Sequence, residues 1–125
     1  PVDGDIVVAT PEHWVFAGTR LEAGYALPGL LGYEVDCVQG WGPADVQILA
    51  ASPWAALDGS GKQGLSHMSL YRAASGAAVF ATGSIQWAWG LDDFNAPALR
   101  TSRLNDAAQR ITRNVLHHMT KRSTH

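Results

Sequence analysis

The chain has 125 residues, of which 46% are hydrophobic, and this suits one globular domain with a continuous core. Nine basic against eleven acidic residues give a formal charge of -2, so the charge favours neither nucleic acid nor an anionic membrane as a partner. Cys37 is the only cysteine, which excludes an internal disulfide and makes a reducing cytoplasmic location the default expectation. The sequence contains no apolar run of about 18 residues, the length that would predict a membrane span.

The first part of the chain predicts short strands and loops. Residues 6–10 and 14–18 are apolar runs, each expected to form a strand or a buried loop. Residues 21–32 mix three glycines and a proline with apolar residues, which predicts a long loop packed over the core. Residues 33–38 predict a strand that places Tyr33, Val35 and Cys37 on one face and Glu34, Asp36 and Val38 on the other. Cys37 is expected to fill the core.

The middle of the chain predicts a β-hairpin. After a turn at residues 40–43, residues 46–51 are expected to form a strand, and residues 58–64 a loop. Two further strands, at residues 67–72 and 77–82, are joined by turn residues 74–76.

The last part predicts a long helix. Residues 92–100 form an irregular connector, after which Thr101 or Ser102 can cap a helix that ends at about Met119. The basic residues near its end suit the negative end of the helix dipole, and residues 123–125 are expected to fray. Helical spacing places one set of residues inward, namely Leu104, Ala107, Ala108, Ile111, Val115 and Leu116.

Four ordered motifs carry a resemblance to a known family. They are residues 13–19, 29–36, 70–77 and 83–92, and residues 109–116 of the closing helix are similar too. In this order they resemble the C-terminal part of the N,N-dimethylformamidase large (beta) subunit-like family. The resemblance implies an amidohydrolase that cleaves the C–N bond of a small N-substituted amide, giving a carboxylate and an amine at a mononuclear iron.

The resemblance also implies the fold. We expect an α/β or α+β chain that forms part of a sheet similar to that of the class I glutamine amidotransferase domain. Its late strands are expected to be largely antiparallel, with one long C-terminal helix. Residues 1–125 are expected to be a single domain that is the C-terminal portion of a larger catalytic domain.

Iron is expected in the parent enzyme and not in this chain. In the family, two tyrosines and a glutamate hold the metal, and by resemblance they precede Pro1, so this chain is expected to contain no metal ligand and to be inactive alone. The expected partners are a small amide substrate, the rest of the large subunit and further copies in a homo-oligomer. The resemblance implies a small companion subunit for the best-known members.

Glu34 is the predicted catalytic residue. The resemblance aligns it with a glutamate that the family places beside the iron. Amide hydrolysis needs a proton for the departing amine, and a carboxylate partly buried among aromatic side chains could take the proton of water and return it to nitrogen. Two simpler interpretations are a solvated strand residue and an ion-pair partner of Arg72.

Four residues are the predicted substrate-binding set: His67, Tyr71, Trp87 and Trp89. A lone histidine among apolar residues also fits a hydrogen-bonded core position, and Tyr71 could equally pack under the sheet. The five tryptophans support another class of function, a non-catalytic carbohydrate- or ligand-binding module, which requires at least three coplanar and exposed rings. A purely structural or subunit-contact module is a further alternative.

Overall fold

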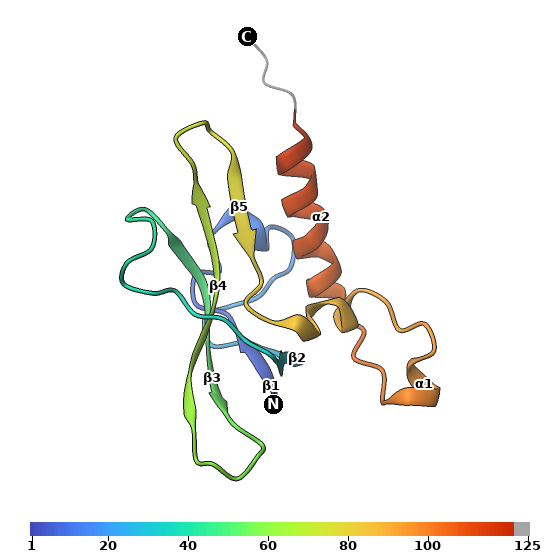
Figure 1. Cartoon of the computed structure of the whole chain (residues 1–125). Coiled ribbons are helices and arrows are strands. Elements are labelled where there is room, and N and C mark those ends of the chain that lie inside the picture. Colours follow the sequence, from blue (N-terminus) through green and yellow to red (C-terminus); the bar gives the residue numbers. More distant parts are fainter. Residues whose placement is uncertain (122–125) are drawn as a thin grey trace.

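The computed structural model describes residues 1–121, which form two small antiparallel sheets and a C-terminal helix (Figure 1). The predicted mixed class, with antiparallel late strands, is therefore confirmed. The predicted fraying of residues 123–125 lies outside the described range. In chain order the elements are β1 (Val2–Val7), η1 (Trp14–Phe16), β2 (Ala26–Tyr33), β3 (Gln47–Ala55), β4 (Gln63–Arg72), β5 (Ala78–Ala81), η2 (Ile85–Gly90), α1 (Ala96–Leu99) and α2 (Asp106–Thr120).

The two sheets are joined through β1. Strands β1 and β2 form one antiparallel pair, and β3, β4 and β5 form the other sheet in that spatial order. Isolated bridges pair Val2 with Ala56 and Val8 with Ala50, so both ends of β1 contact β3 or the residue that follows it. The five strands therefore share one core.

The predicted hairpin of residues 67–72 and 77–82 is confirmed. Strands β4 and β5 pair through Leu70 and Phe80, and the Ala73 amide donates to the Ala77 carbonyl at 2.8 Å to close the turn. The predicted strand at residues 46–51 is confirmed as β3, which continues to Ala55 because it pairs with β4 along its length.

The predicted loop at residues 21–32 is correct for residues 21–25 and wrong for residues 26–32, because residues 26–33 form β2. Pairing with β1 is irregular between Gly4 and Ile6, and the opposed β2 residues include Pro28 and Gly29. Gly29 has a φ of +71°. Proline and glycine are typical of such a bulge. The two residues that made this strand resemble a loop in the sequence therefore mark the position where its pairing with β1 is irregular.

The predicted strand at residues 33–38 is also wrong. Strand β2 ends at Tyr33, whose φ of +51° turns the backbone away from the strand direction. Glu34 lies in a bend, and Val35 makes only an isolated bridge to Ser84. The alternating aromatic and acidic residues therefore form a turn and the segment that follows it, and not a strand.

Helix α2 begins later than expected. The Asn105 side chain caps it, with Oδ1 accepting from the Ala108 amide at 2.9 Å, in place of Thr101 or Ser102. The inward positions Ala108, Ile111 and Val115 are buried, as predicted. Leu104 and Leu116 are exposed, because Leu104 precedes the helix and Leu116 lies on its outer side.

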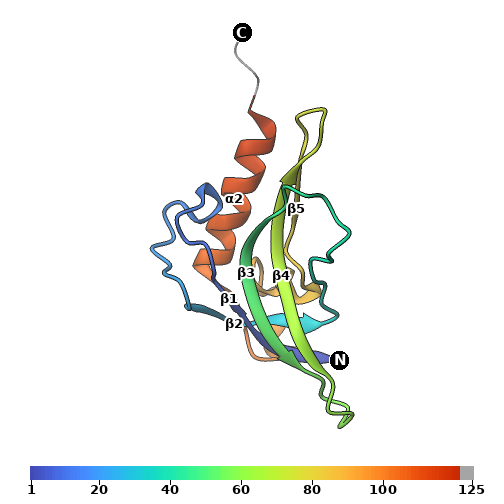
Figure 2. The same ribbon diagram turned by 90° about the vertical axis from the view of Figure 1, so that its left-hand side faces the viewer.

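Helix α2 and the loop of residues 36–46 lie on opposite sides of the β3–β4–β5 sheet (Figure 2). On the helix side, Trp87 Nε1 donates to Thr112 Oγ1 at 3.1 Å, and Asn114 Nδ2 donates to the carbonyls of Val15 and Ala17 at 2.9 and 2.8 Å. These bonds attach α2 to η2 and η1.

No helix within residues 1–121 is long and apolar enough to cross a membrane.

His118 connects the end of α2 to two other elements. Its ring stacks on Trp14 with centroids 4.0 Å apart and planes 17° apart, and its Nε2 contacts Arg72 Nη2 at the end of β4. Because a guanidinium only donates, Nε2 must accept, which requires the neutral ring. Burial lowers the pKa of His118 below its usual value, and the neighbouring positive charges of Arg72 and Lys121 lower this pKa further.

Acid is therefore expected to weaken this attachment. Since the folded-state pKa of His118 is lowered, its contribution to stability is complete above the unfolded value near 6.5 and is lost as the pH falls through the folded value. Urea unfolding at pH 7.5 and 5.0 should show a larger loss of stability in the native chain than in His118→Gln. The exposed neighbour gives the control, because the charge of His117 is the smallest of the causes that lower the His118 pKa, and His117→Gln should keep most of the native pH dependence. Equal losses in the native chain and His118→Gln would contradict the assignment.

Candidate functional site

Side chains satisfy the backbone of β2 where its pairing with β1 is irregular. Ser84 Oγ donates to the Leu30 carbonyl at 2.6 Å and accepts from the Gly32 amide at 2.9 Å. Gln86, only 4% exposed, donates from Nε2 to the carbonyls of Gly29 and Leu31 at 3.2 and 3.4 Å. Buried backbone groups need such partners, so Ser84 and Gln86 replace ladder bonds lost at the bulge.

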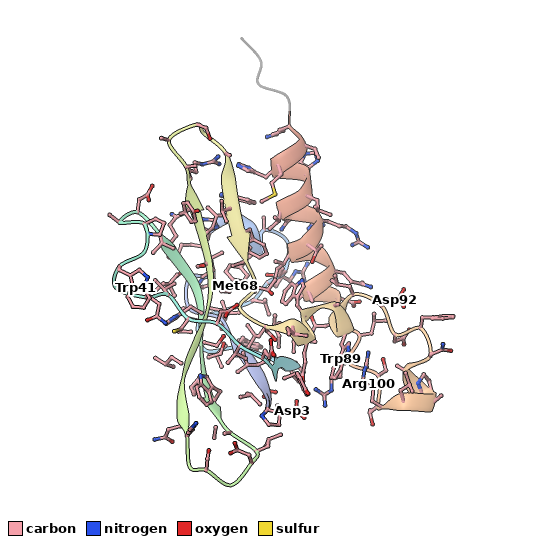
Figure 3. All side chains as sticks on the ribbon, in the orientation of Figure 1. Asp3, Trp41, Met68, Trp89, Asp92 and Arg100 are labelled. Carbon is pink, nitrogen blue, oxygen red and sulfur yellow. The ribbon has the colours of Figure 1, made fainter. Side chains whose placement is uncertain are left out.

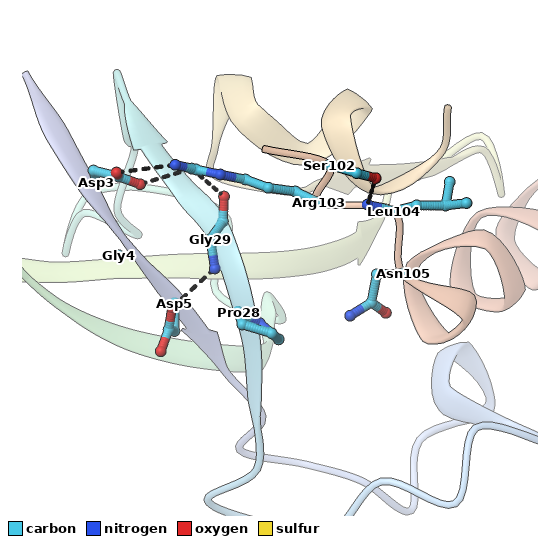
Figure 4. Close-up of a pocket in the computed structure, with 9 residues that line it drawn as sticks. All are labelled: Asp3, Gly4, Asp5, Pro28, Gly29, Ser102, Arg103, Leu104 and Asn105. Atoms are coloured by element: carbon cyan, nitrogen blue, oxygen red, sulfur yellow. Dashed lines mark hydrogen bonds and ion pairs between the residues drawn. The ribbon is translucent and has the colours of Figure 1, made fainter. Parts of the chain in front are cut away.

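A bidentate ion pair extends this arrangement to the residues before α2. Arg103 donates from Nη1 and Nη2 to the two carboxylate oxygens of Asp3 at 2.8 and 3.1 Å, and from Nη1 to the Gly29 carbonyl at 2.8 Å (Figure 4). The Arg103 hydrogen bonds hold the pKa of Asp3 below its usual value, although partial burial opposes the shift. The pair borders a hollow of about 410 Å³ between β1, β2 and the start of α2.

Glu34 lies on the solvent side of this arrangement. It is exposed, and the Ile85 amide donates to its carbonyl at 3.2 Å, which holds the bend against η2. The expected burial of Glu34 among aromatic side chains is wrong for this chain, because the turn at Tyr33 directs it outward. The alternative pairing with Arg72 is also wrong, since Arg72 contacts the Gly76 carbonyl and His118.

The two tryptophans of the predicted substrate-binding set make their contacts within the chain. Trp87 is 7% exposed and belongs to the core, where its indole bonds to α2. Trp89 is half-buried, and the guanidinium carbons of Arg100 and Arg103 lie 4.3 and 5.1 Å from its ring centroid. Both rings are therefore occupied by contacts within the chain, and a role for either in binding substrate stays a prediction.

His67 and Tyr71, the other predicted substrate-binding residues, come together on the outer face of β4. Ser66, Met68 and Leu70 point inward, so the residues between them face the loop of residues 36–43. This loop and the sheet enclose a groove of about 270 Å³ with mainly apolar walls. Its lining is Asp36, Cys37, Val38, Gln39, Trp41, Gly42, Pro43, Val46, His67, Ser69, Tyr71 and Ala81.

Backbone bonds fix the orientation of His67 in this groove. Its Nδ1 accepts from the Val38 amide at 3.0 Å, and its own amide donates to the Asp36 carbonyl at 3.0 Å. In the neutral ring the hydrogen then lies on Nε2. The groove thus contains an oriented imidazole donor within walls that are mainly, but not entirely, apolar.

Comparison with protein-family models identifies the family of this chain. The model described as N,N-dimethylformamidase beta subunit-like, C-terminal, matches residues 1–103. The chain belongs to this family. No curated protein and no solved structure matches it.

Membership of the N,N-dimethylformamidase beta subunit-like family confirms the resemblance inferred from the four motifs. The match includes Glu34, the groove and both residues of the Asp3–Arg103 pair, and it ends before α2. At the level of the family, it supports a hydrolase of the amidohydrolase kind. The resemblance of residues 109–116 lies beyond the match and stays a prediction.

The acidic, histidine and cysteine side chains of the described residues in this dimethylformamidase-like chain do not group into a metal site. Within residues 1–121, no three His, Cys, Asp or Glu side chains are grouped so that they could hold a metal ion. Tyr33 and Glu34 are adjacent at a turn and both exposed. We therefore assign no step to iron on any residue of this chain.

A tryptophan platform for sugars is absent from the described part of the chain. Trp41 is 84% exposed, whereas Trp14, Trp54 and Trp89 are half-buried and Trp87 lies in the core. In Figure 3, Trp41 and Trp89 lie on opposite sides of the strand that carries Met68. The binding-module alternative required three exposed coplanar rings, so the structure does not support it.

The sequence interpretation missed the contribution of residues 37–43 to a groove. Cys37 was expected to fill the core, but it is exposed, and Gln39 Nε2 contacts its sulfur at 3.0 Å. Trp41 lies in the turn predicted at residues 40–43, and an exposed tryptophan between two glycines is the one signal in the sequence that could have indicated a binding surface.

Gly83 is expected to be essential for the packing of its segment against β4, because its backbone passes close to that strand. A Cβ there would lie 2.1 Å from the His67 carbonyl oxygen, and its φ is +73°. Gly83→Ala should therefore destabilise the chain by about 3 kcal/mol or more, combining backbone strain with a steric clash. Gly76 has a similar φ of +89° and open space around it, so Gly76→Ala should cost only about 1–2 kcal/mol. Denaturant unfolding measures both values, and equal losses would contradict the close approach.

Proposed function

We propose that the chain is the C-terminal part of an amidohydrolase resembling N,N-dimethylformamidase, which hydrolyses a small N-substituted amide to a carboxylate and an amine. The observation that carries the proposal is the family match over residues 1–103, which spans Glu34 and the groove. The chain contributes one side of the active centre.

Glu34 handles the proton in this proposal. Its side chain is exposed on a bend held by backbone bonds, and within residues 1–121 its carboxylate makes no hydrogen bond or ion pair. In hydrolysis, the oxygen of water bonds to the amide carbon and the C–N bond breaks. Glu34 takes a proton from that water and gives it to the departing nitrogen. The burial that favours this transfer comes from the substrate or from protein outside this chain.

Protein outside this chain supplies the remainder of the proposed centre. The iron is held there, as the family resemblance implies, and the complete domain has the glutamine amidotransferase-like fold. The small subunit, the homo-oligomer and the cytoplasmic location are further parts of the same proposal.

The outer face of the β3–β4–β5 sheet supports such partners. Ile48, Leu65 and Val79 are exposed, and by strand alternation and pairing they share the outer face with Tyr71. An antiparallel sheet with one solvated face normally carries polar residues there. An apolar outer face is typical of a surface that another part of a protein covers.

Replacement of Glu34 tests the catalytic assignment. In the amide-hydrolysing protein that carries this chain, Glu34→Gln should lower kcat at least about 100-fold, because the amide side chain cannot transfer the proton. Glu12 is also exposed but lies in the loop before η1, so Glu12→Gln should leave kcat unchanged. Unfolding midpoints of both variants should match that of the native protein. Full activity of Glu34→Gln would show that Glu34 is not the proton carrier.

A further inference from the structure

We propose that the groove between the loop of residues 36–43 and β4 binds an aromatic substituent on the amide nitrogen. This inference rests on the proposed amide hydrolysis and names its substrate class, the N-aryl amides. Three features of the groove favour such a ligand: its size, the exposure of Trp41 and the orientation of His67.

The groove is larger than a dialkylformamide needs. Its volume is about 270 Å³, and an apolar cavity of about 150 Å³ already holds benzene. A phenyl ring with an attached planar amide therefore fits. A molecule of the size of dimethylformamide would leave much of the wall without contacts and would lose the corresponding dispersion energy.

The walls of the groove suit a flat ring. Val38, Pro43 and Val46 contribute apolar surface, and Trp41 presents an indole that is 84% exposed. Aromatic rings stack at centroid distances of about 4.5–7 Å, with a gain of about 0.5–1.5 kcal/mol beyond burial. A bound aryl group would cover the exposed indole and extend the apolar wall.

The polar end of the groove suits the amide carbonyl. The Val38 amide occupies Nδ1 of His67, so the neutral ring presents Nε2–H as its remaining polar atom. Asp36, whose carbonyl accepts from the His67 amide, follows Glu34 by two residues. Asp36 also lines the groove, so an amide bound with its carbonyl toward His67 would lie beside the segment that leads back to Glu34.

Binding to the 125-residue chain tests this inference directly. We would titrate ¹⁵N-labelled chain with N-phenylformamide or N,N-dimethylformamide and follow the indole N–H signals. N-phenylformamide should shift the Trp41 signal and bind with a Kd at least about tenfold lower than that of N,N-dimethylformamide, since tenfold corresponds to about 1.4 kcal/mol. Equal Kd values, or no shift of the Trp41 signal, would overturn the inference.

Matched variants locate the binding. Phe94 is 84% exposed, like Trp41, but does not line the groove. Trp41→Ala should raise the Kd for N-phenylformamide at least about fivefold, Trp41→Phe should restore most of the affinity, and Phe94→Ala should leave it unchanged. An unchanged Kd in Trp41→Ala would place the ligand elsewhere and overturn the inference.

The binding readout also separates this inference from the proposed function. Failure of N-phenylformamide to bind, with hydrolysis still dependent on Glu34, would remove the groove assignment alone. Selective binding in the groove, with hydrolysis independent of Glu34, would remove the assigned role of Glu34 and leave the binding site.

Discussion

The arrangement of this chain depends on how the irregular stretch of β2 satisfies its backbone groups. Proline and glycine interrupt the pairing with β1, and a buried, unpaired backbone group is costly. Ser84 and Gln86 supply the missing hydrogen bonds from one side, and Arg103 reaches the Gly29 carbonyl from the residues before α2. A single stretch of strand thereby fixes the position of η2 and of the helix entrance.

This constraint also positions the candidate site. Because Ser84 is bonded to β2 and bridges to Val35, the chain after Glu34 must run beside Gly83 toward His67. On the same short helix Trp87 enters the core, so a tryptophan of the predicted substrate-binding set instead bonds to α2. The exposed carboxylate of Glu34 and the groove at His67 are thus connected by one short segment that backbone bonds hold at both ends.

The sequence predicted the elements whose signals are local. The β4–β5 hairpin has two apolar strands and a turn between them, and the inner face of α2 follows from helical spacing at Ala108, Ile111 and Val115. Strand β2 was missed because Pro28 and Gly29 are turn residues in most contexts and function here as a bulge. The bulge arises from the pairing of β2 with β1, so it cannot be inferred from the residues of β2 alone.

The site was predictable only in part for a similar reason. Alternation along β4 correctly places His67 and Tyr71 on one face, but the loop that covers them is brought there by non-local bonds. Whether Glu34 is buried depends on the left-handed turn at Tyr33, which no residue preference indicates for a tyrosine. The family, in contrast, was recognisable because the order of several motifs is specific.

Amide hydrogen exchange in Ser84→Ala tests the central constraint most directly. The Gly32 amide donates to Ser84 Oγ, and the Asp36 amide donates to the Gly83 carbonyl next to it. If Ser84 holds this segment, both amides should lose protection by at least about tenfold, while amides between β3 and β4 keep theirs. Unchanged protection of Gly32 and Asp36 would show that the segment is held by other contacts and would contradict the account.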